Sequence, residues 1–268
     1  MMYLIRVVIL QPSTPILIEC LLTHVSQKSY ASDMYKRILL KLSGEQLQGD
    51  KDGGFDAERA KWIAGQIKPA VEAGSQVAII VGGGNYARGA QLMGNGIVDV
   101  TAHNVGMLAT IMNAVTLADV FNAAGLETRA LSNIEVNQFI DSYTYRRAVS
   151  HLEKNRVVII GGGTGRPFVT TDTAAVNLAL ELKCDAIIKT TKVDGVYDKD
   201  PMKFPDAKKF DTLTYDEALA NNDIQVMDKA ALGMALEDKK TLIVCDLLSE
   251  GNIARAAAGE NVGTTIRG

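Results

Sequence analysis

The sequence predicts a doubly wound α/β fold built around one mostly parallel sheet. Short, nearly all-apolar runs recur along the chain, which is typical of parallel strands covered on both faces. Amphipathic stretches of helical length separate these runs, and such alternation indicates βαβ crossovers. No Pro/Gly/Ser-rich linker and no repeat of about 20–50 residues divides the chain. A single domain is therefore expected.

The apolar runs and the amphipathic stretches give the expected elements in chain order. The expected strands are Ile38–Leu42, Gln76–Val81, Thr128–Leu131, Arg156–Ile160, Asp185–Lys189, Leu242–Cys245 and Thr264–Ile266. Apolar residues at three- and four-residue spacing predict a helix across Val105–Val120. The same spacing predicts helices over Asp172–Lys183 and Val226–Asp238.

Composition narrows the class of function. Of 268 residues, 47% are hydrophobic and 22% charged, which is globular and excludes a disordered or collagenous chain. The net charge of −3 offers no positive field for nucleic acid or an anionic membrane. Three dispersed cysteines without a C-x-x-C, and only three histidines, argue against a structural zinc site. Sparse, odd-numbered cysteine fits a reducing, cytoplasmic location.

The N-terminal segment, residues 1–33, is expected to be an extension outside the fold. Its apolar residues are interrupted by Gln11, Pro12, Pro15 and Glu19, and a second methionine, Met34, precedes the first clear strand. A weak secretion signal or membrane anchor is the alternative, although no continuous apolar stretch with a cleavage site is present. We therefore assign the domain to residues 34–268.

Two glycine-rich segments each follow a buried strand. Gly82–Gly84 follows Val81, with Arg88 close behind, and Gly161–Gly165 follows Ile160. Open α/β sheets bind ligands at the carboxyl ends of their strands, where glycine lets backbone amides approach a phosphate. Tight turns are the simpler explanation for one triplet, but two equivalent triplets favour phosphate binding. Neither a Walker loop nor a G-x-G-x-x-G fingerprint occurs, which points to another class of phosphate-binding protein.

Charged residues near the strand and helix ends complete the candidate site. Lys41 interrupts an apolar strand, so it is expected to face a polar site and to neutralise phosphoryl charge. An edge-strand lysine reaching solvent is the alternative. Asp172 and Asp228 stand at helix starts, where helix capping alone would explain them. Tyr197 could pack against a flat base, or simply be partly buried.

Five motifs together resemble the bacterial UMP kinases (uridylate kinases) of the amino-acid kinase superfamily. They are KRILLKLSGE at 36–45, VGGGNYARG at 81–89, VGMLATIMNA at 105–114, GTGRPFVTTD at 163–172 and KTTKVDGVYDKDP at 189–201. The resemblance covers nearly the whole chain after the extension. It implies a three-layer α/β/α sandwich and transfer of the γ-phosphoryl group of ATP to UMP in pyrimidine nucleotide biosynthesis.

The resemblance also implies roles for individual residues. Lys41, Arg88, Asp172 and Asp228 would be catalytic, with the two acids orienting Lys41 and the magnesium–phosphate assembly. ATP would be held by Lys41, Leu42, Ser43, Gly44, Gly84, Arg88, Thr191, Tyr197 and Asp200. UMP would be held by Gly83, His103, Thr164, Gly165, Arg166, Pro167, Phe168, Val169, Thr170 and Thr171. Mg²⁺ would arrive with the nucleotide phosphates, and no resident metal site is expected.

Two positions depart from the family pattern. His103 stands where the family has an acid that meets the UMP ribose, with Asp99 nearby, and Arg166 stands where the family has asparagine. An added charge changes acceptor contacts more than it changes the chemistry. The resemblance further implies a homohexamer, GTP activation and UTP inhibition. The alternatives are a relative that phosphorylates a carboxylate, a carbamate or an isoprenoid phosphate, and a nucleotide-binding regulatory protein without turnover.

Overall fold

The computed structural model describes residues 34–87, 92–93, 96–221, 223–224 and 226–268. The expected extension, residues 1–33, and the candidate residue Arg88 lie outside the described residues. The described residues belong to one compact unit, Asp33–Gly268.

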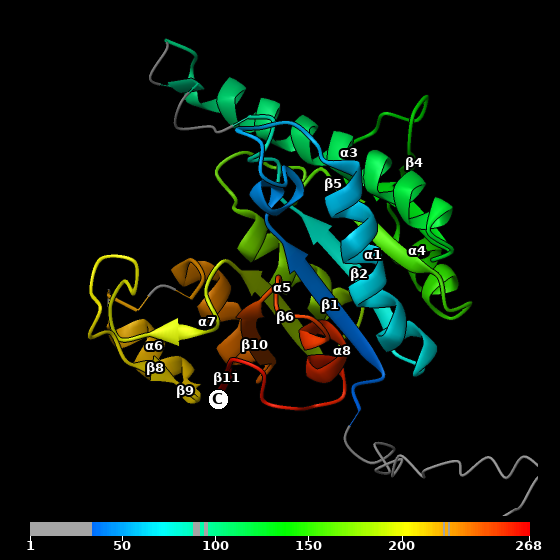
Figure 1. Cartoon of the computed structure of the whole chain (residues 1–268). Coiled ribbons are helices and arrows are strands. Elements are labelled where there is room, and N and C mark those ends of the chain that lie inside the picture. Colours follow the sequence, from blue (N-terminus) through cyan, green and yellow to red (C-terminus); the bar gives the residue numbers. More distant parts are fainter. Residues whose placement is uncertain (1–33, 88–91, 94–95, 222, 225) are drawn as a thin grey trace, which may run out of the picture. The chain divides into compact units, whose positions relative to one another are not determined.

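One mixed sheet organises the domain. Among the described residues its strands run in the order β4-β3-β5-β2-β1-β6-β10-β11-β9, with β1 near the middle (Figure 1). The strands are β1 (Arg37–Leu42), β2 (Gln76–Val81), β3 (Thr128–Ser132), β4 (Asp141–Ser142), β5 (Val157–Gly161), β6 (Ala186–Thr191), β9 (Thr212–Thr214), β10 (Thr241–Asp246) and β11 (Thr264–Arg267). Neighbouring strands are parallel except β10 and β11, which confirms the mostly parallel sheet.

Helices cover both faces of this sheet and form the three expected layers. One face carries α1 (Ala57–Glu72), α3 (Asp99–Ala123) and α8 (Asn252–Ala257). The other carries α4 (Tyr145–Leu152), α5 (Thr171–Glu181), α6 (Tyr215–Ala220) and α7 (Lys229–Glu237). A short 3₁₀ turn, η2 (Gly44–Leu47), follows β1, and β7 (Val196–Tyr197) pairs with β8 (Lys209–Phe210) in a separate ribbon.

The side-chain alternation of β1 sets up the site. Ile38, Leu40 and Leu42 point into the core beneath α1, whereas Leu39 points into the core beneath α5. Because strand side chains alternate, Lys41 follows Leu39 on the α5 face, at the last position before the strand end. The same alternation places Lys189 of β6 beyond the buried Ile187 on that face.

The long helix α3 packs across β3 and β5. By length and composition α3 is long and apolar enough to cross a membrane, since its most apolar 18-residue stretch has a mean hydropathy of 1.4. Half of that stretch, however, is buried within this domain. Leu108 and Met112, about half exposed, lie on its outer side. Within the described residues α3 is therefore a core helix with one uncovered apolar strip.

All seven expected strands are confirmed to within two residues at each end. The helices expected over Val105–Val120 and Asp172–Lys183 are α3 and α5, and α3 begins earlier, at Asp99. The helix expected from Val226 begins later, at Lys229, because Asp228 is in an extended conformation (φ −64°, ψ 156°) and caps it.

Candidate active site

The candidate residues come from four adjacent parallel strands. In the order β5-β2-β1-β6, the carboxyl ends carry Gly161–Gly165, Gly82–Gly84, Lys41 and Lys189. The chain continues from β1 to β2 on one side of β1, whereas β6, which comes later in the sequence, lies on the other side. β1 therefore stands at the point where the strand order reverses. That is where open α/β sheets bind their ligands.

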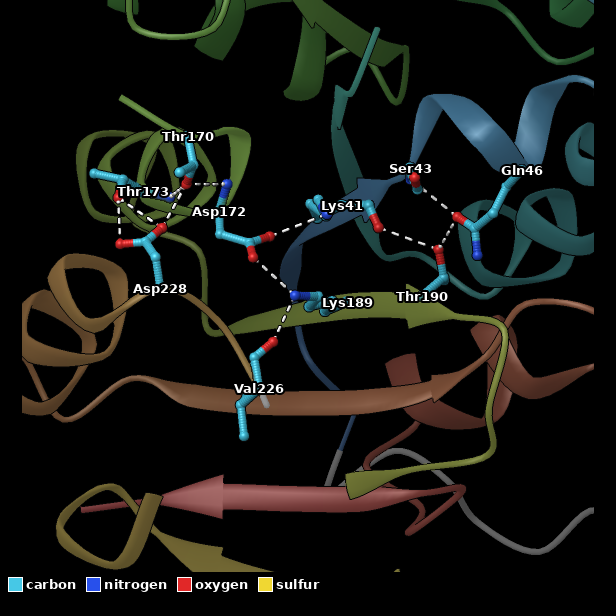
Figure 2. A network of polar contacts seen from close by, with 10 residues as sticks. All are labelled: Lys41, Ser43, Gln46, Thr170, Asp172, Thr173, Lys189, Thr190, Val226 and Asp228. Carbon is cyan, nitrogen blue, oxygen red and sulfur yellow. Dashed lines mark hydrogen bonds and ion pairs between the residues drawn. The ribbon is translucent and has the colours of Figure 1, made fainter. Parts of the chain in front are cut away.

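Lys41 lies against Asp172, the acid in the first turn of α5. The Lys41 Nζ is 3.0 Å from Asp172 Oδ1, and Lys189 Nζ donates a 2.8 Å hydrogen bond to Asp172 Oδ2 (Figure 2). The exposed fraction of the side chain is only 13% for Lys41, 16% for Asp172 and 14% for Lys189. One carboxylate is thus shared by two ammonium groups in a poorly solvated place.

The electrostatics keep this acid ionised. Burial raises the pKa of Asp172, but the charges of Lys189 and Lys41 and the hydrogen bond from Lys189 outweigh burial, and the pKa lies below its usual value. Burial and the charge of Lys41 lower the pKa of Lys189, against the opposing effect of Asp172. The cluster carries one more positive than negative charge when all three groups are ionised.

Asp228 joins two helix starts and does not contact Lys41. Its carboxylate accepts hydrogen bonds from the hydroxyl groups of Thr170 and Thr173 and from the Ala231 amide. Burial raises the pKa of Asp228, while these hydrogen bonds lower it to a net value below the usual one. The residue therefore caps α7 and fixes the start of α5 beside it (Figure 2).

The segment after β1 is held by a buried amide. Gln46 Oε1 accepts hydrogen bonds from the Ser43 backbone amide (2.9 Å) and from the Thr190 hydroxyl (2.9 Å). That hydroxyl oxygen also lies 3.1 Å from the Lys41 carbonyl oxygen. Ser43 is thus held in place close to Lys41 (Figure 2).

Glycine is required where the β1 segment meets the first glycine segment, Gly82–Gly84. A Cβ on Gly44 would lie 2.6 Å from the Gly84 nitrogen and 2.7 Å from the Gly82 carbonyl oxygen, so only hydrogen fits. Among the described residues, the Gly83 and Gly84 amides have no hydrogen-bond acceptor. These two donors can serve an anion.

The second glycine segment, Gly161–Gly165, is fixed by α3. Thr110 Oγ1 accepts a 2.7 Å hydrogen bond from the Gly162 amide, so this amide is not free for a ligand. The Gly165 amide donates to the Gly162 carbonyl. The Thr164 hydroxyl is buried without a partner among the described residues, which leaves one unsatisfied polar group within this segment.

The loop that follows presents an aromatic contact. Phe168 is 63% exposed, has a left-handed φ of 64°, and its ring centroid lies 4.6 Å from that of His103 on α3. The structure therefore brings together two of the residues expected to bind UMP. The other expected residues between β5 and α5 are Arg166, Pro167, Val169, Thr170 and Thr171.

The residues expected on the adenine and ribose side of ATP lie at the end of β6 and in the segment that follows it, and they make local contacts. Thr191 donates to the Val193 carbonyl, and Tyr197 donates to Asp194. Asp200 accepts from the Met202 amide. A cavity of about 440 Å³, lined by Asp172, Lys189 and the segment Val226–Lys229 among others, opens beside the charged cluster.

The sequence interpretation overlooked Lys189. The sequence carries a signal for Lys189, because this lysine interrupts an apolar strand in the same way as Lys41. No group of three or more His, Cys, Asp or Glu side chains in the described part of the chain is placed to hold a metal ion.

Comparison with known proteins agrees with this geometry. The amino acid kinase family matches residues 36–246. The solved structure of UMP kinase from Bacillus anthracis is 39% identical, with a TM-score of 0.84, covering 87% of this chain and 96% of that chain. UMP kinase from Ureaplasma parvum is 31% identical (TM-score 0.81; 87% and 99% covered). Uridylate kinase from Archaeoglobus fulgidus is 28% identical (TM-score 0.66; 85% and 99% covered).

Proposed function

Since this chain belongs to the amino acid kinase family, we propose that it is a UMP kinase that transfers the γ-phosphoryl group of ATP to UMP. The observation that carries this proposal is the Lys41–Asp172 pair, which lies at the carboxyl end of the central strand β1, next to the first glycine segment at the end of β2. An ammonium group in that place can meet the phosphates of two nucleotides at once.

The reaction requires little covalent work from the protein. An oxygen of the UMP phosphate attacks the γ-phosphorus of ATP, the bond to the bridging oxygen breaks, and ADP leaves with the electron pair. Negative charge spreads over the transferring oxygens, and Lys41 neutralises it. No strong base is needed, because the UMP phosphate is already ionised at neutral pH.

Each nucleotide would have its own set of residues. Lys41, Leu42, Ser43, Gly44, Gly84 and Arg88 would hold the ATP phosphates, with Thr191, Tyr197 and Asp200 on the adenine and ribose side. Gly83, His103 and the residues from Thr164 to Thr171 would hold UMP. Within the described part of the chain, the Thr164 hydroxyl and the Gly83 amide have no hydrogen-bond partner, and a bound substrate could supply one to each, which supports this assignment.

Mg²⁺ would be carried by the ATP phosphates. The protein supplies few donors for a cage: both oxygens of Asp172 face ammonium groups, and Asp228 accepts from two hydroxyls. This donor set fits a cation that keeps mainly phosphate and water ligands. When bound, the ion would neutralise part of the negative charge of the phosphates.

We also infer a cytoplasmic homo-oligomer, a hexamer by family resemblance, responsive to GTP as an activator and UTP as an inhibitor. The half-exposed Leu108 and Met112 on α3 support self-association, because apolar side chains together on one helix face gain by burial against a second copy.

A coupled assay of ADP release tests the proposed function. UMP should be the preferred acceptor over CMP, aspartate, acetylglutamate and isopentenyl phosphate. Lys41→Met should lower kcat by about 100- to 1,000-fold, with a smaller effect on UMP affinity. Lys68→Met, which removes an exposed lysine paired with Glu72 on α1, is the matched control and should leave kcat unchanged. Preference for another acceptor, or ATP binding without acceptor-dependent ADP release, would reject UMP kinase activity.

A further inference from the structure

Lys189 occupies an unusual place for a lysine. It lies within the central strand β6, and its Cα is the register partner of Lys41 on the adjacent strand β1. Both side chains project from the same face of the sheet and meet Asp172 (Figure 2). A charged side chain within a sheet interior costs free energy, and two neighbouring like charges add to that cost. A purely structural pairing of Asp172 would need only one of them.

The two lysines hold Asp172 in different ways. Lys189 Nζ makes a hydrogen bond of 2.8 Å to Oδ2 and a second one to the Val226 carbonyl. Lys41 Nζ lies 3.0 Å from Oδ1 as an ion pair, yet Oδ1 is buried without a hydrogen-bond partner among the described residues. Lys189 Nζ is therefore anchored at two points, whereas Lys41 Nζ has one polar contact among the described residues and is the freer of the two to move.

Other charges nearby do not duplicate this anchor. Asp228 is the remaining acid close to Lys189, and its oxygens are engaged by Thr170, Thr173 and the Ala231 amide. Asp172 thus depends on Lys189 whenever Lys41 turns towards a phosphate. Without Lys189, a departing Lys41 would leave a buried carboxylate with no cation beside it, which is costly.

We propose that Lys189 is a positioning residue that holds Asp172 while Lys41 moves from Asp172 to the transferring phosphoryl group. The inference rests on the proposed function for the role of Lys41. The contact with Val226 also joins β6 to the segment preceding α7, so the anchor spans three elements that border the cavity beside the cluster.

The test compares Lys189→Met with wild type and with the control Lys68→Met. Lys189→Met should lower kcat by about 100-fold, as expected for a misplaced catalytic group. It should lower kcat/KM equally and leave the KM for UMP nearly unchanged, because the lost interaction matters in the transition state. Lys189→Gln, which keeps a donor but not the charge, should show the same loss, and serves if the methionine variant does not fold.

A double-mutant cycle separates positioning from general destabilisation. If Lys189 acts through Asp172, the double variant Lys189→Met/Asp172→Asn should be no slower than Asp172→Asn alone. Additive losses, or a folded Lys189→Met or Lys189→Gln enzyme with wild-type kcat, would overturn the inference.

Failure of the proposed function gives a different result. If wild type transfers to another acceptor, UMP kinase activity is rejected, and the same variants compared with that acceptor still decide the role of Lys189. Absence of transfer to every acceptor would overturn both proposals.

Discussion

Helix α3 lies so close to the first glycine segment that Gly83 and Gly84 should tolerate a methyl group very differently. A Cβ on Gly83 would lie 2.7 Å from the Gly106 carbonyl oxygen, 2.8 Å from Ala109 Cβ and 3.1 Å from the Thr110 nitrogen. These atoms belong to the body of α3 and cannot yield without moving the helix. On Gly84 the nearest atom would be Glu45 Cγ at 3.5 Å, an ordinary contact.

The loss of stability expected for Gly83→Ala follows from these distances. Overpacking against a fixed helix costs about 1–3 kcal/mol, so Gly83→Ala should lower the free energy of unfolding by that amount. Neither glycine has a left-handed φ. Gly84→Ala should therefore be neutral or gain about 0.5 kcal/mol from the restricted unfolded chain. In a domain of this size, each kcal/mol shifts Tm by about 2–4 °C.

Equilibrium unfolding in urea, measured on both variants beside wild type, gives the comparison directly. If Gly83→Ala were as stable as wild type, the close approach of α3 to the first glycine segment would be wrong. Equal destabilisation by both variants would instead indicate that the segment itself, and not its contact with α3, requires glycine.

Two further predictions concern buried polar groups. Asn113, fully buried on α3, exchanges paired amide hydrogen bonds with Asn85 and donates to the Gly82 carbonyl. Asn113→Leu should lower the free energy of unfolding by about 1–3 kcal/mol because the partners of Asn113 lose their hydrogen bonds, whereas Thr116→Ala on the same helix should be nearly neutral. Equal losses of stability in the two variants, measured by urea unfolding, would contradict this prediction. Asp172 has a folded-state pKa below its unfolded value of 3.8, so its stabilising contribution is complete above that value and is lost as pH falls through the folded pKa. Unfolding free energies measured from about pH 5 to about pH 3 should therefore fall more steeply for wild type than for Asp172→Asn; parallel curves would show that Asp172 is not held ionised by the two lysines.

Much of the fold could be predicted because its central strands are long and apolar. β2 and β5 are nearly all buried, and their sequences are hydrophobic runs. β1 and β6 each carry a run of three buried apolar residues directly before Lys41 and Lys189. The peripheral strands β4, β7, β8 and β9 have only two or three residues and no repeating pattern. Pairing with a neighbour, and not local sequence, creates them.

The site could be predicted in part. Lys41 and Asp172 are named by motif and meet as expected, with a contact of 3.0 Å. The direct bond from the Gly162 amide to Thr110 and the pairing of Asn85 with Asn113 join residues 28 to 52 positions apart, and no local pattern reveals such contacts. Asp228 was expected to orient Lys41, whereas its described contacts are with the starts of α5 and α7, so that assignment stays a prediction.

A crystal structure with UMP and a non-hydrolysable ATP analogue would show whether Lys41 leaves Asp172 for the γ-phosphoryl group. We expect Lys41 Nζ within about 3 Å of a γ-phosphoryl oxygen, with Asp172 still bonded to Lys189 and one nucleotide on each side of β1. Phosphates bound away from the glycine segments, or Lys41 still paired with Asp172 while both nucleotides are present, would contradict the account.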